Sequence, residues 1–343
     1  RNTAIDFMNR TYSYSALGEL VEQAAMAFRK EGVEKGTKVG IYLPNCPQFI
    51  ISYFGILKAG GVVVNCSPLY SENELQFQLD DSDAEMLVTL DLKLLYPKAK
   101  SILDKSLEKG GKLKKIIVSS LADALPFPKN LLFPIVKKGE IEKPKFSKNV
   151  IKWKKFLKEC CEIHDKLEEK INPDDTAIIQ YTGGTTGTPK GAELTHKNVY
   201  VNTVQSKMWS SIIPDGEGSV LTVLPLFHVF AMTTAMNFGV LTASKLILHP
   251  RFELEKVLKD IDTKKPTAMP GVPTMYNAIN NYSELDKYDL TSLKVCVSGG
   301  GPLPIEVKQK FEDRTACKLI EAYGLTETSP VAACNPVNGL NKT

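Results

Sequence analysis

The sequence predicts an α/β fold in which two parallel or mixed β-sheets are flanked by helices. Short apolar runs alternate along the chain with segments whose apolar residues recur at helical spacing. This alternation is typical of parallel sheets covered by helices on both faces. The chain has 343 residues, which is long for one domain. We therefore expect two lobes, approximately residues 1–170 and 171–343.

In the first lobe, helix and strand patterns follow one another closely. Apolar residues recur between Leu17 and Phe28 on one helical face, and Gly32 ends that helix. Ser71 and Glu74 have the spacing of a capping box that opens a later helix. The other expected elements are strands at residues 38–43, 62–64, 84–89 and 115–119 and a helix at residues 48–58.

The second lobe repeats the pattern. Residues 218–244 contain no Asp, Glu, Lys or Arg and are long enough to cross a membrane, but Pro225, His228 and Asn237 favour a buried strand followed by a buried helix. The expected strands are residues 176–181, 219–224, 245–248, 294–298 and 318–321, and the expected helices are residues 197–210, 231–243, 253–262, 274–281 and 305–315.

Positive charge is concentrated in the first lobe. Residues 93–158 carry eighteen Lys and five acidic residues, whereas the whole chain has a net charge of +4. Within them, residues 121–148 are rich in Pro and Lys without a clear period, which predicts a long loop or insertion. Its apolar residues and lysines indicate either a peripheral contact with an anionic membrane or a solvated loop packed on its own lobe. We expect no nucleic-acid partner.

The cysteines indicate a reducing, cytoplasmic location. Their number is seven, and they are scattered along the chain without a framework of pairs. Cys161 and His164 have no second pair with which to form a structural zinc site. The first ten residues are polar and lack the apolar core of a signal peptide.

The most informative segment runs from Tyr181 to Gly191 and reads Tyr-Thr-Gly-Gly-Thr-Thr-Gly-Thr-Pro-Lys-Gly. It lies between an expected strand and an expected helix. Its glycines permit backbone angles that aim several N–H groups at one point, its hydroxyls add donors, and Lys190 adds a mobile positive charge. Pro189 before the lysine excludes the usual P-loop. The predicted phosphate-binding residues are Thr182, Gly183, Gly184, Thr185, Thr186, Gly187 and Lys190.

This segment resembles the phosphate-binding signature of the adenylate-forming superfamily, which includes acyl-CoA synthetases, luciferases and peptide-synthetase adenylation domains. The usual pattern has Ser at the position of Gly183, and the other fixed positions match. Residues 224–230, 270–276, 298–303 and 321–328 also resemble superfamily segments, in the expected order. The resemblance covers essentially the whole chain and implies the large N-terminal domain of the adenylate-forming fold, ending before the C-terminal domain.

The resemblance assigns these segments to an acyl site and a nucleotide site. The implied acyl-site residues are Phe227, His228, Phe230, Gly271, Thr274 and Tyr276, with His228 orienting the acyl carboxylate or gating its tunnel. The implied nucleotide-site residues are Gly299, Gly300, Gly301, Pro302, Glu321, Ala322, Tyr323, Gly324 and Thr326. Tyr323 stacks on adenine, Thr326 bonds the α-phosphate, and Glu327 with Thr185 holds Mg²⁺, which prefers carboxylate oxygen together with substrate phosphates. The implied catalytic set is Lys190, His228, Thr326 and Glu327.

The implied activity is that of a long-chain fatty-acid–CoA ligase. A fatty acid and ATP form an acyl-adenylate and pyrophosphate, and CoA then displaces AMP to give a thioester. The implied cofactors are ATP, Mg²⁺ and the co-substrate CoA. The superfamily's Tyr-x-Thr-Gly-Asp segment, hinge and C-terminal catalytic Lys are not recognisable in the sequence, so we expect little ligase activity from these 343 residues alone.

Three alternatives are open. An aryl-CoA ligase of the coumarate type is distinguished by the shape of its tunnel. An amino-acid adenylation domain usually needs an acidic residue near residues 227–237, which contain none. A non-catalytic nucleotide- or membrane-binding module would bind lipid without ATP, and the presence of Lys190, Thr326 and Glu327 argues against it.

Overall fold

A computed structural model describes residues 2–159, 170–182, 187–210 and 212–339 of the chain. The chain forms two compact units: unit 1 comprises Arg1–Asp6, Thr11–Tyr14 and Asn198–Thr343, and unit 2 comprises Phe7–Arg10 and Ser15–Lys197. The units divide between residues 197 and 198 rather than near residue 170, because the two strands between residues 176 and 195 complete the sheet of unit 2.

Unit 2 is built on a seven-stranded sheet with the order β7-β6-β5-β3-β4-β8-β9. Every neighbouring pair from β7 to β8 is parallel, and only the edge strand β9 is antiparallel to its neighbour. The strands are β3 (Lys38–Ile41), β4 (Val62–Asn65), β5 (Met86–Leu90), β6 (Lys115–Ser119), β7 (Val150–Lys152), β8 (Thr176–Thr182) and β9 (Lys190–Thr195).

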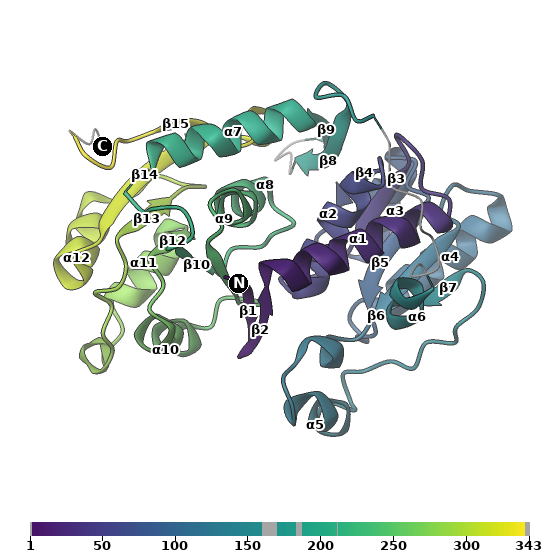
Figure 1. The fold of residues 1–343 in the computed structure, drawn as a ribbon, viewed down its shortest axis with the longest axis horizontal. Helices are drawn as coiled ribbons and strands as arrows, with labels where there is room; N and C mark the ends of the chain where they lie inside the picture. The colour runs from purple at the N-terminus through teal and green to yellow at the C-terminus, as the bar shows by residue number, and fades with distance from the viewer. Residues whose placement is uncertain (1, 160–169, 183–186, 211, 340–343) are drawn as a thin grey trace. The chain divides into compact units, whose positions relative to one another are not determined.

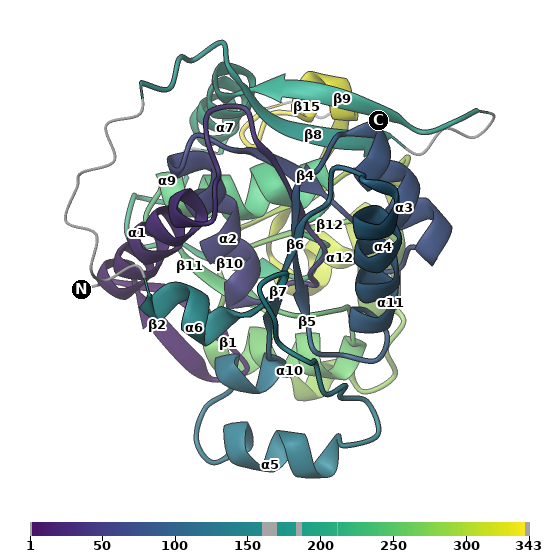
Figure 2. The same ribbon diagram turned by 90° about the vertical axis from the view of Figure 1, so that its right-hand side faces the viewer.

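Helices cover both faces of this sheet (Figure 1, Figure 2). The helices are α1 (Tyr14–Lys30), α2 (Pro47–Lys58), α3 (Glu72–Asp81), α4 (Tyr96–Lys109) and α6 (Trp153–Lys158). Phe28 of α1 packs edge-on against Phe156 of α6 at 4.9 Å between ring centroids. A complete capping box of Ser71 and Glu74 opens α3, as the sequence predicts. The expected parallel sheet with helices on both faces is therefore confirmed for unit 2.

The Pro- and Lys-rich insertion contains more regular structure than its sequence indicates. A 3₁₀ turn, η1 (Leu121–Ala124), is followed by the helix α5 (Lys129–Val136), where a loop is expected. The helix is missed because it has only about two turns, and because Pro134 inside it is read as a helix breaker.

A half-buried carboxyl group lies at the base of this insertion. The Asp91 N–H donates to the carbonyl of Ser119, and its carbonyl accepts a 2.7 Å hydrogen bond from the N–H of Glu142. Burial raises the pKa of the Asp91 side chain to about 6; a hydrogen bond from Ser120 opposes this rise, and the charge of Asp123 adds to it.

We expect Asp91→Asn to stabilise the chain at neutral pH. Because the folded pKa lies above an unfolded value of about 4, the stability contributed by protonated Asp91 is complete below about pH 4 and is lost as the pH rises through about 6. The variant should gain about 1–2 kcal/mol of unfolding free energy at about pH 7.5, and nothing at about pH 4. Denaturant titrations at both pH values measure this difference, and an equal effect of the substitution at the two would contradict it.

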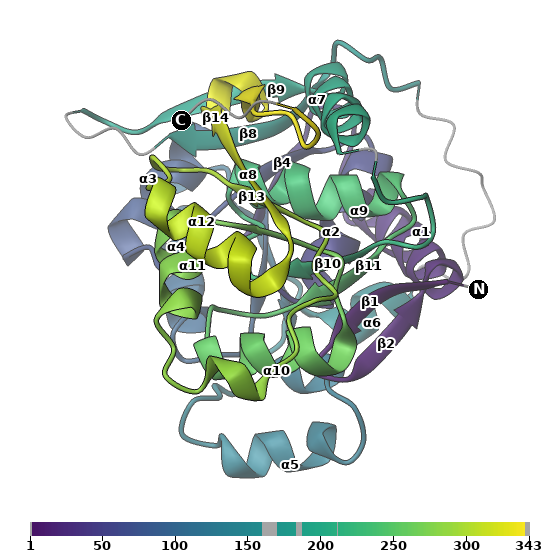
Figure 3. The same cartoon turned by 90° about the vertical axis from the view of Figure 1, so that its left-hand side faces the viewer.

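Unit 1 is built on an eight-stranded sheet with the order β15-β14-β13-β12-β10-β11-β1-β2 (Figure 3). The pairs among β10 to β14 are parallel, and β15 is antiparallel to β14. The strands are β1 (Thr3–Phe7), β2 (Arg10–Ser13), β10 (Ser219–Thr222), β11 (Lys245–Leu248), β12 (Ala268–Gly271), β13 (Val295–Ser298), β14 (Lys318–Gly324) and β15 (Val331–Cys334).

The helices of unit 1 lie on the two faces of its sheet (Figure 1, Figure 3). One face carries α10 (Leu254–Lys264), α11 (Pro273–Asn280) and α12 (Ile305–Thr315), and the other carries α7 (His196–Trp209), α8 (Val229–Ala231), the π-helix η2 (Met232–Asn237) and α9 (Phe238–Leu241). Short 3₁₀ turns form at η3 (Leu285–Lys287) and η4 (Thr326–Thr328). The buried strand and helix expected within residues 218–244 correspond to β10 and the continuous run α8–η2–α9.

Among the residues with described coordinates, no helix is long and apolar enough to span a membrane.

Candidate functional site

The Gly/Thr segment connects two antiparallel strands of unit 2. Thr182 ends β8 and pairs with Lys190 at the start of β9, so a strand follows the segment where the sequence predicts a helix. The hydroxyl of Thr182 donates to the carbonyl of Lys190 at 3.4 Å. Gly187 and the Lys190 side chain are exposed, whereas the predicted phosphate-binding residues Gly183, Gly184, Thr185 and Thr186 lie outside the described residues.

Tyr181 fixes the start of this connection. Its hydroxyl donates to the Asp81 carboxylate at 2.6 Å and lies 3.3 Å from the carbonyl of Gln78, both near the end of α3. Burial, and then the hydrogen bond and charge of Asp81, raise the pKa of the Tyr181 hydroxyl well above its ordinary value, so it remains a donor at neutral pH. The strand that leads into the Gly/Thr segment is thus tied to the helix layer of unit 2.

In unit 1, three of the predicted segments meet at the carboxyl ends of neighbouring parallel strands. The strand register places Gly271 of β12 opposite Ser298 of β13, and Ser298 opposite Glu321 of β14. The Gly299 N–H donates to the carbonyl of Gly271 at 3.1 Å. Ligands of open α/β sheets bind at this edge, where loops leave the carboxyl ends of the strands. The sequence order of the segments could not reveal this convergence, because it depends on strand pairing.

The glycine turn after β13 packs against the ring of Phe230 at its start and is held by a hydrogen bond to Glu321 at its end. A Cβ at Gly299 would lie 3.0 Å from the Phe230 ring, and Gly300 has a φ of +76°, which other residues rarely adopt. The Glu321 carboxylate accepts a 2.9 Å hydrogen bond from the N–H of Leu303, at the end of the turn. Glu321 therefore positions the turn, while Gly300, Gly301 and Pro302 present an exposed surface.

The segment after β14 forms a tight turn that exposes one side chain predicted for the nucleotide site and one predicted as a Mg²⁺ ligand. The Thr328 hydroxyl donates to the carbonyl of Leu325 at 2.9 Å and so closes η4. Tyr323 is 69% exposed, and Glu327 is exposed on η4. In the described part of the chain, no cation lies within ion-pair distance of Glu327, so its carboxylate is available to a ligand.

His228 caps the short helix α8. Its Nδ1 accepts a 3.3 Å hydrogen bond from the N–H of Phe230, which leaves the proton of the neutral ring on Nε2. Surrounding protein atoms displace water and lower the pKa of His228 from its ordinary value, although the residue keeps an exposed surface. The ring is therefore neutral at pH 7 and can donate one hydrogen bond from Nε2.

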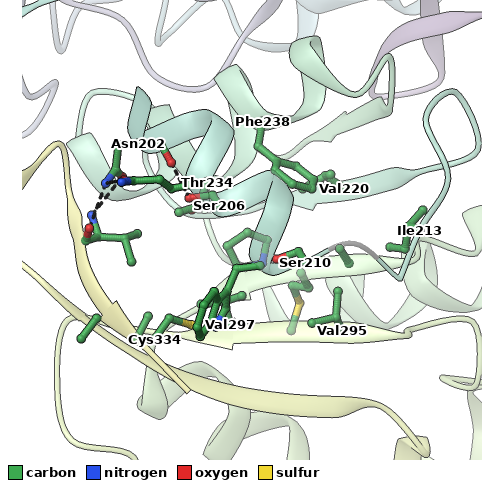
Figure 4. Close-up of a pocket in the computed structure, with 18 of the residues that line it drawn as sticks. Asn202, Ser206, Ser210, Ile213, Val220, Thr234, Phe238, Val295, Val297 and Cys334 are labelled. Atoms are coloured by element: carbon green, nitrogen blue, oxygen red, sulfur yellow. Dashed lines mark hydrogen bonds between the residues drawn. The ribbon is translucent and has the colours of Figure 1, made fainter. Parts of the chain in front are cut away.

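A cavity of about 460 Å³ lies in unit 1 between the sheet and the layer formed by α7, η2 and α9 (Figure 4). Its volume is in the range of small-molecule sites. Most of its lining is apolar, with a few polar groups from α7 and Thr234 of η2. The strand residues that line it include Val220, Ala268, Val295, Val297 and Ala322, and the facing residues include Asn202, Ser206, Trp209, Thr234 and Phe238.

Two side chains of α7 hold the edge of the sheet beside this cavity. The Asn202 side chain donates to the carbonyl of Val331 at 2.8 Å and accepts from its N–H at 3.1 Å (Figure 4). The Trp209 indole N–H donates to the carbonyl of Asn335 at 3.0 Å. The bonds of Asn202 satisfy the backbone of β15 at its open edge, and the bond of Trp209 holds the residue that follows β15, so that this edge and α7 together close one side of the cavity.

None of the predicted acyl-site residues lines the cavity. Ala322, predicted for the nucleotide site, lines it, whereas the residues predicted for the acyl site do not: Phe227, His228, Phe230, Gly271, Thr274 and Tyr276. Tyr276 is fully buried in α11, and its hydroxyl donates to the carbonyls of Met269 and Val297. Tyr276 therefore supports β12 and β13 from the face opposite the π-helix. The roles of these residues toward a ligand stay predictions.

Most of the cavity lining was not predicted. Val295, Val297 and Ala268 occur in short apolar strands, and a strand pattern alone does not distinguish a residue that faces a cavity from one that faces packed core. The π-helix was also not predicted; such segments are frequent at functional sites. In the described residues, no group of three His, Cys, Asp or Glu side chains is arranged to hold a metal ion.

Comparison with known proteins identifies relatives over the whole chain. The sequence pattern of the AMP-binding enzyme family matches residues 1–343. A long-chain-fatty-acid–CoA ligase of Bacillus subtilis (strain 168) is 42% identical to this chain over an alignment of 347 positions. The alignment covers 99% of this chain and 60% of that protein. A long-chain-fatty-acid–CoA ligase of Yersinia pestis is 34% identical over 317 residues, which cover 89% of this chain and 54% of that protein.

Solved structures share the fold. The anthranilate CoA ligase AuaEII, in complex with anthranoyl-AMP, matches with a TM-score of 0.81 at 20% identity, over 99% of this chain and 60% of that one. The predicted two-sheet α/β fold and the resemblance to adenylate-forming acyl-CoA ligases are thus confirmed. The chain spans between half and two thirds of the length of these relatives. It belongs to the family of AMP-binding enzymes.

Proposed function

We propose that this chain is the nucleotide- and acyl-binding part of a long-chain fatty-acid–CoA ligase. The observation that carries the proposal is the apolar cavity of about 460 Å³ that runs along β12 and β13 of unit 1. The glycine turn that follows β13 lies at the carboxyl end of the same strands. An acyl-adenylate fits this arrangement if its adenine lies against the turn and its acyl chain extends back along the strands toward Val295.

The first half-reaction joins a fatty acid to ATP. A carboxylate oxygen attacks the α-phosphorus, a new O–P bond forms, and pyrophosphate leaves with the electron pair of the broken P–O bond. The carboxylate needs no base, because it is ionised at neutral pH. The Nε2–H of neutral His228 is suited to orienting the carboxylate, and Thr326 to donating to the α-phosphate as charge shifts there.

Negative charge on the phosphates has to be neutralised during this step. Lys190 on β9 and the hydroxyls of the Gly/Thr segment supply positive charge and donors for the β- and γ-phosphates. The exposed Glu327 carboxylate fits a Mg²⁺ ion that is otherwise held by phosphate oxygens and water. When bound, Mg²⁺ would supply further charge neutralisation.

In the second half-reaction, the CoA thiolate attacks the carbonyl carbon of the acyl-adenylate. A C–S bond forms, the C–O bond to phosphate breaks, and AMP leaves. Together, the two half-reactions make ATP, Mg²⁺ and CoA the cofactors of the proposed function. A cytoplasmic location is part of the same proposal, and peripheral contact with the inner membrane surface is proposed independently of the ligase reaction.

Calorimetric titration with non-hydrolysable acyl-adenylate mimics tests the proposal. We expect the palmitoyl mimic to bind at least about 100-fold more tightly than the benzoyl mimic, because each buried methylene contributes about 0.8 kcal/mol. Lys190→Ala should leave the binding of both mimics unchanged and weaken the binding of ATP, since Lys190 is assigned to the β- and γ-phosphates, which an acyl-adenylate lacks. Tighter binding of the benzoyl mimic would support the aryl-CoA ligase instead, and binding of neither mimic would overturn the assignment of the adenylate site.

A further inference from the structure

The helix α5 of unit 2 exposes most of its apolar surface. None of its residues is buried, and Leu131, Ile135 and Val136 are 61%, 72% and 73% exposed. Phe127, just before the helix, is 79% exposed. Leu131 and Ile135 are separated by four residues, as are Leu132 and Val136, so these side chains form two adjacent rows on the helix. A contiguous apolar surface of this kind marks an interaction site.

The segment that carries α5 is fixed to unit 2 at both ends. Before the helix, Leu125 is buried, and Arg10 donates to its carbonyl at 3.4 Å. After the helix, Ile141 forms an antiparallel bridge with Leu92, and the N–H of Lys93 donates to the carbonyl of Glu140 at 2.8 Å. Between these anchors α5 stands apart from the sheet of unit 2 (Figure 1, Figure 2). Its apolar residues are therefore presented to a partner rather than left on a loose loop.

Lysines without an ion-pair partner flank this apolar surface along the chain. In the part of the chain that the structure describes, no carboxylate lies within ion-pair distance of exposed Lys129 at the start of α5, or of exposed Lys138 and Lys143 after its end. Lys137 is the neighbour that is paired, with Glu140 at 2.6 Å. Lysine side chains can lay their apolar stems along a membrane interface while the ammonium groups contact anionic headgroups. The charge of the surface is thus complementary to an anionic lipid layer.

We propose that α5 and its flanking lysines dock the chain on an anionic membrane surface. With eight residues, α5 is about 12 Å long and is too short to span a hydrocarbon core of about 30 Å. It therefore lies in the plane of the interface, with Phe127, Leu131 and Ile135 directed into the boundary between headgroups and acyl chains. The inference rests on the proposed function for its purpose alone: a long-chain fatty acid partitions into membranes, so docking concentrates the chain on the surface that holds its substrate.

A second copy of the chain is a less favourable partner for the same surface. A two-fold contact would bring the same surface of both copies together. Ammonium groups around one α5 would then face those around the other without carboxylates between them, and like charges at short distance repel. An anionic lipid layer avoids this repulsion and attracts the same charges.

Vesicle co-sedimentation of the full 343-residue chain tests the docking surface. We expect the chain to bind vesicles of equal phosphatidylglycerol and phosphatidylcholine at least about tenfold more tightly than pure phosphatidylcholine vesicles, with a decrease at high salt. The double variant Ile135→Asp/Val136→Asp and the double variant Lys138→Glu/Lys143→Glu should each lose at least about tenfold in binding to the anionic vesicles.

Matched controls distinguish the loss of the docking surface from a general change in net charge and from a loss of folding. Leu69→Asp changes another apolar residue of unit 2 that is 81% exposed, and Lys259→Glu/Lys318→Glu changes the net charge as much as the lysine variant on α5 and its flank. Both controls should bind anionic vesicles like the parent chain. Equal loss in the controls, no preference for anionic vesicles, or a concentration-dependent dimer abolished by Ile135→Asp/Val136→Asp without vesicle binding would each overturn the proposal.

The proposed docking surface and the proposed ligase function can be tested, and contradicted, independently of each other. Vesicle binding is measured without fatty acid, ATP or CoA, so it does not depend on the adenylate site. The α5 variants should bind the palmitoyl-adenylate mimic as tightly as the parent chain, because their side chains are exposed in unit 2 and line no part of the cavity in unit 1. Loss of mimic binding in these variants would place α5 in the acyl site and overturn its assignment as a membrane surface.

Discussion

Val297→Trp is expected to abolish binding of the palmitoyl-adenylate mimic while leaving the acetyl-adenylate mimic nearly unaffected. Val297 lines the cavity on β13, two residues before the glycine turn that is assigned to adenine. An indole at this position blocks the cavity close to the carboxyl end of the strand. Losing the burial of even six methylenes costs about 5 kcal/mol, which corresponds to a decrease of more than about 1,000-fold in affinity.

Ala268→Phe provides the matched control for this prediction. Ala268 lines the same cavity but pairs with Val295, one pleat repeat further from the turn. We expect this variant to keep binding an octanoyl mimic and to lose the palmitoyl mimic, because the ring shortens the cavity from its inner end. Calorimetric titration with the acetyl, octanoyl and palmitoyl mimics measures both effects. Equal losses for all three chain lengths in both variants would mean that the cavity does not hold the acyl chain.

Glu327→Ala is expected to weaken binding of ATP in the presence of Mg²⁺ by at least about tenfold without changing the stability of the fold. The carboxylate is exposed on η4 and, among the described residues, has no ion-pair partner, so the folded state loses no ion pair. Its loss should change the unfolding free energy by less than about 0.5 kcal/mol. The affinity decreases because a cation held by the phosphates loses its protein carboxylate.

Glu217→Ala is the control, because Glu217 is another exposed acidic residue of unit 1. This control should bind ATP like the parent chain. Titrations with and without Mg²⁺ distinguish the loss of a metal ligand from a general effect of charge, because Glu327→Ala should lower the affinity for ATP only when Mg²⁺ is present. A loss of ATP affinity that is the same without the metal would exclude Glu327 as its ligand.

Much of the fold could be predicted from the sequence because it depends on local periodicity. The strand of residues 115–119 is observed with the predicted limits, and the Ser71–Glu74 capping box forms as expected. The hairpin of β8 and β9 was missed. In β9 the exposed Lys190 and Glu193 and the small Gly191 and Ala192 weaken the alternation that would indicate a strand.

The parts of the candidate site that consist of short sequence motifs could be predicted from the sequence. The parts that depend on how distant segments pack together could not. Glycines and a carboxylate after β13 and β14 are visible as motifs, and the register of these strands brings them together. The cavity was not predicted, because its walls come from α7, the π-helix and five strands that are far apart in sequence. Asn202 illustrates the difficulty: its hydrogen bonds to Val331 cross 129 positions, and no local pattern indicates them.

A crystal structure of the chain with the palmitoyl-adenylate mimic tests the assignment of the cavity to a fatty acyl chain. We expect electron density for the acyl chain inside the cavity between α7 and β13, with the adenine against the turn of Gly299 to Pro302. Density for the acyl chain elsewhere, with the cavity filled only by water, would contradict the assignment of this cavity to a fatty acid.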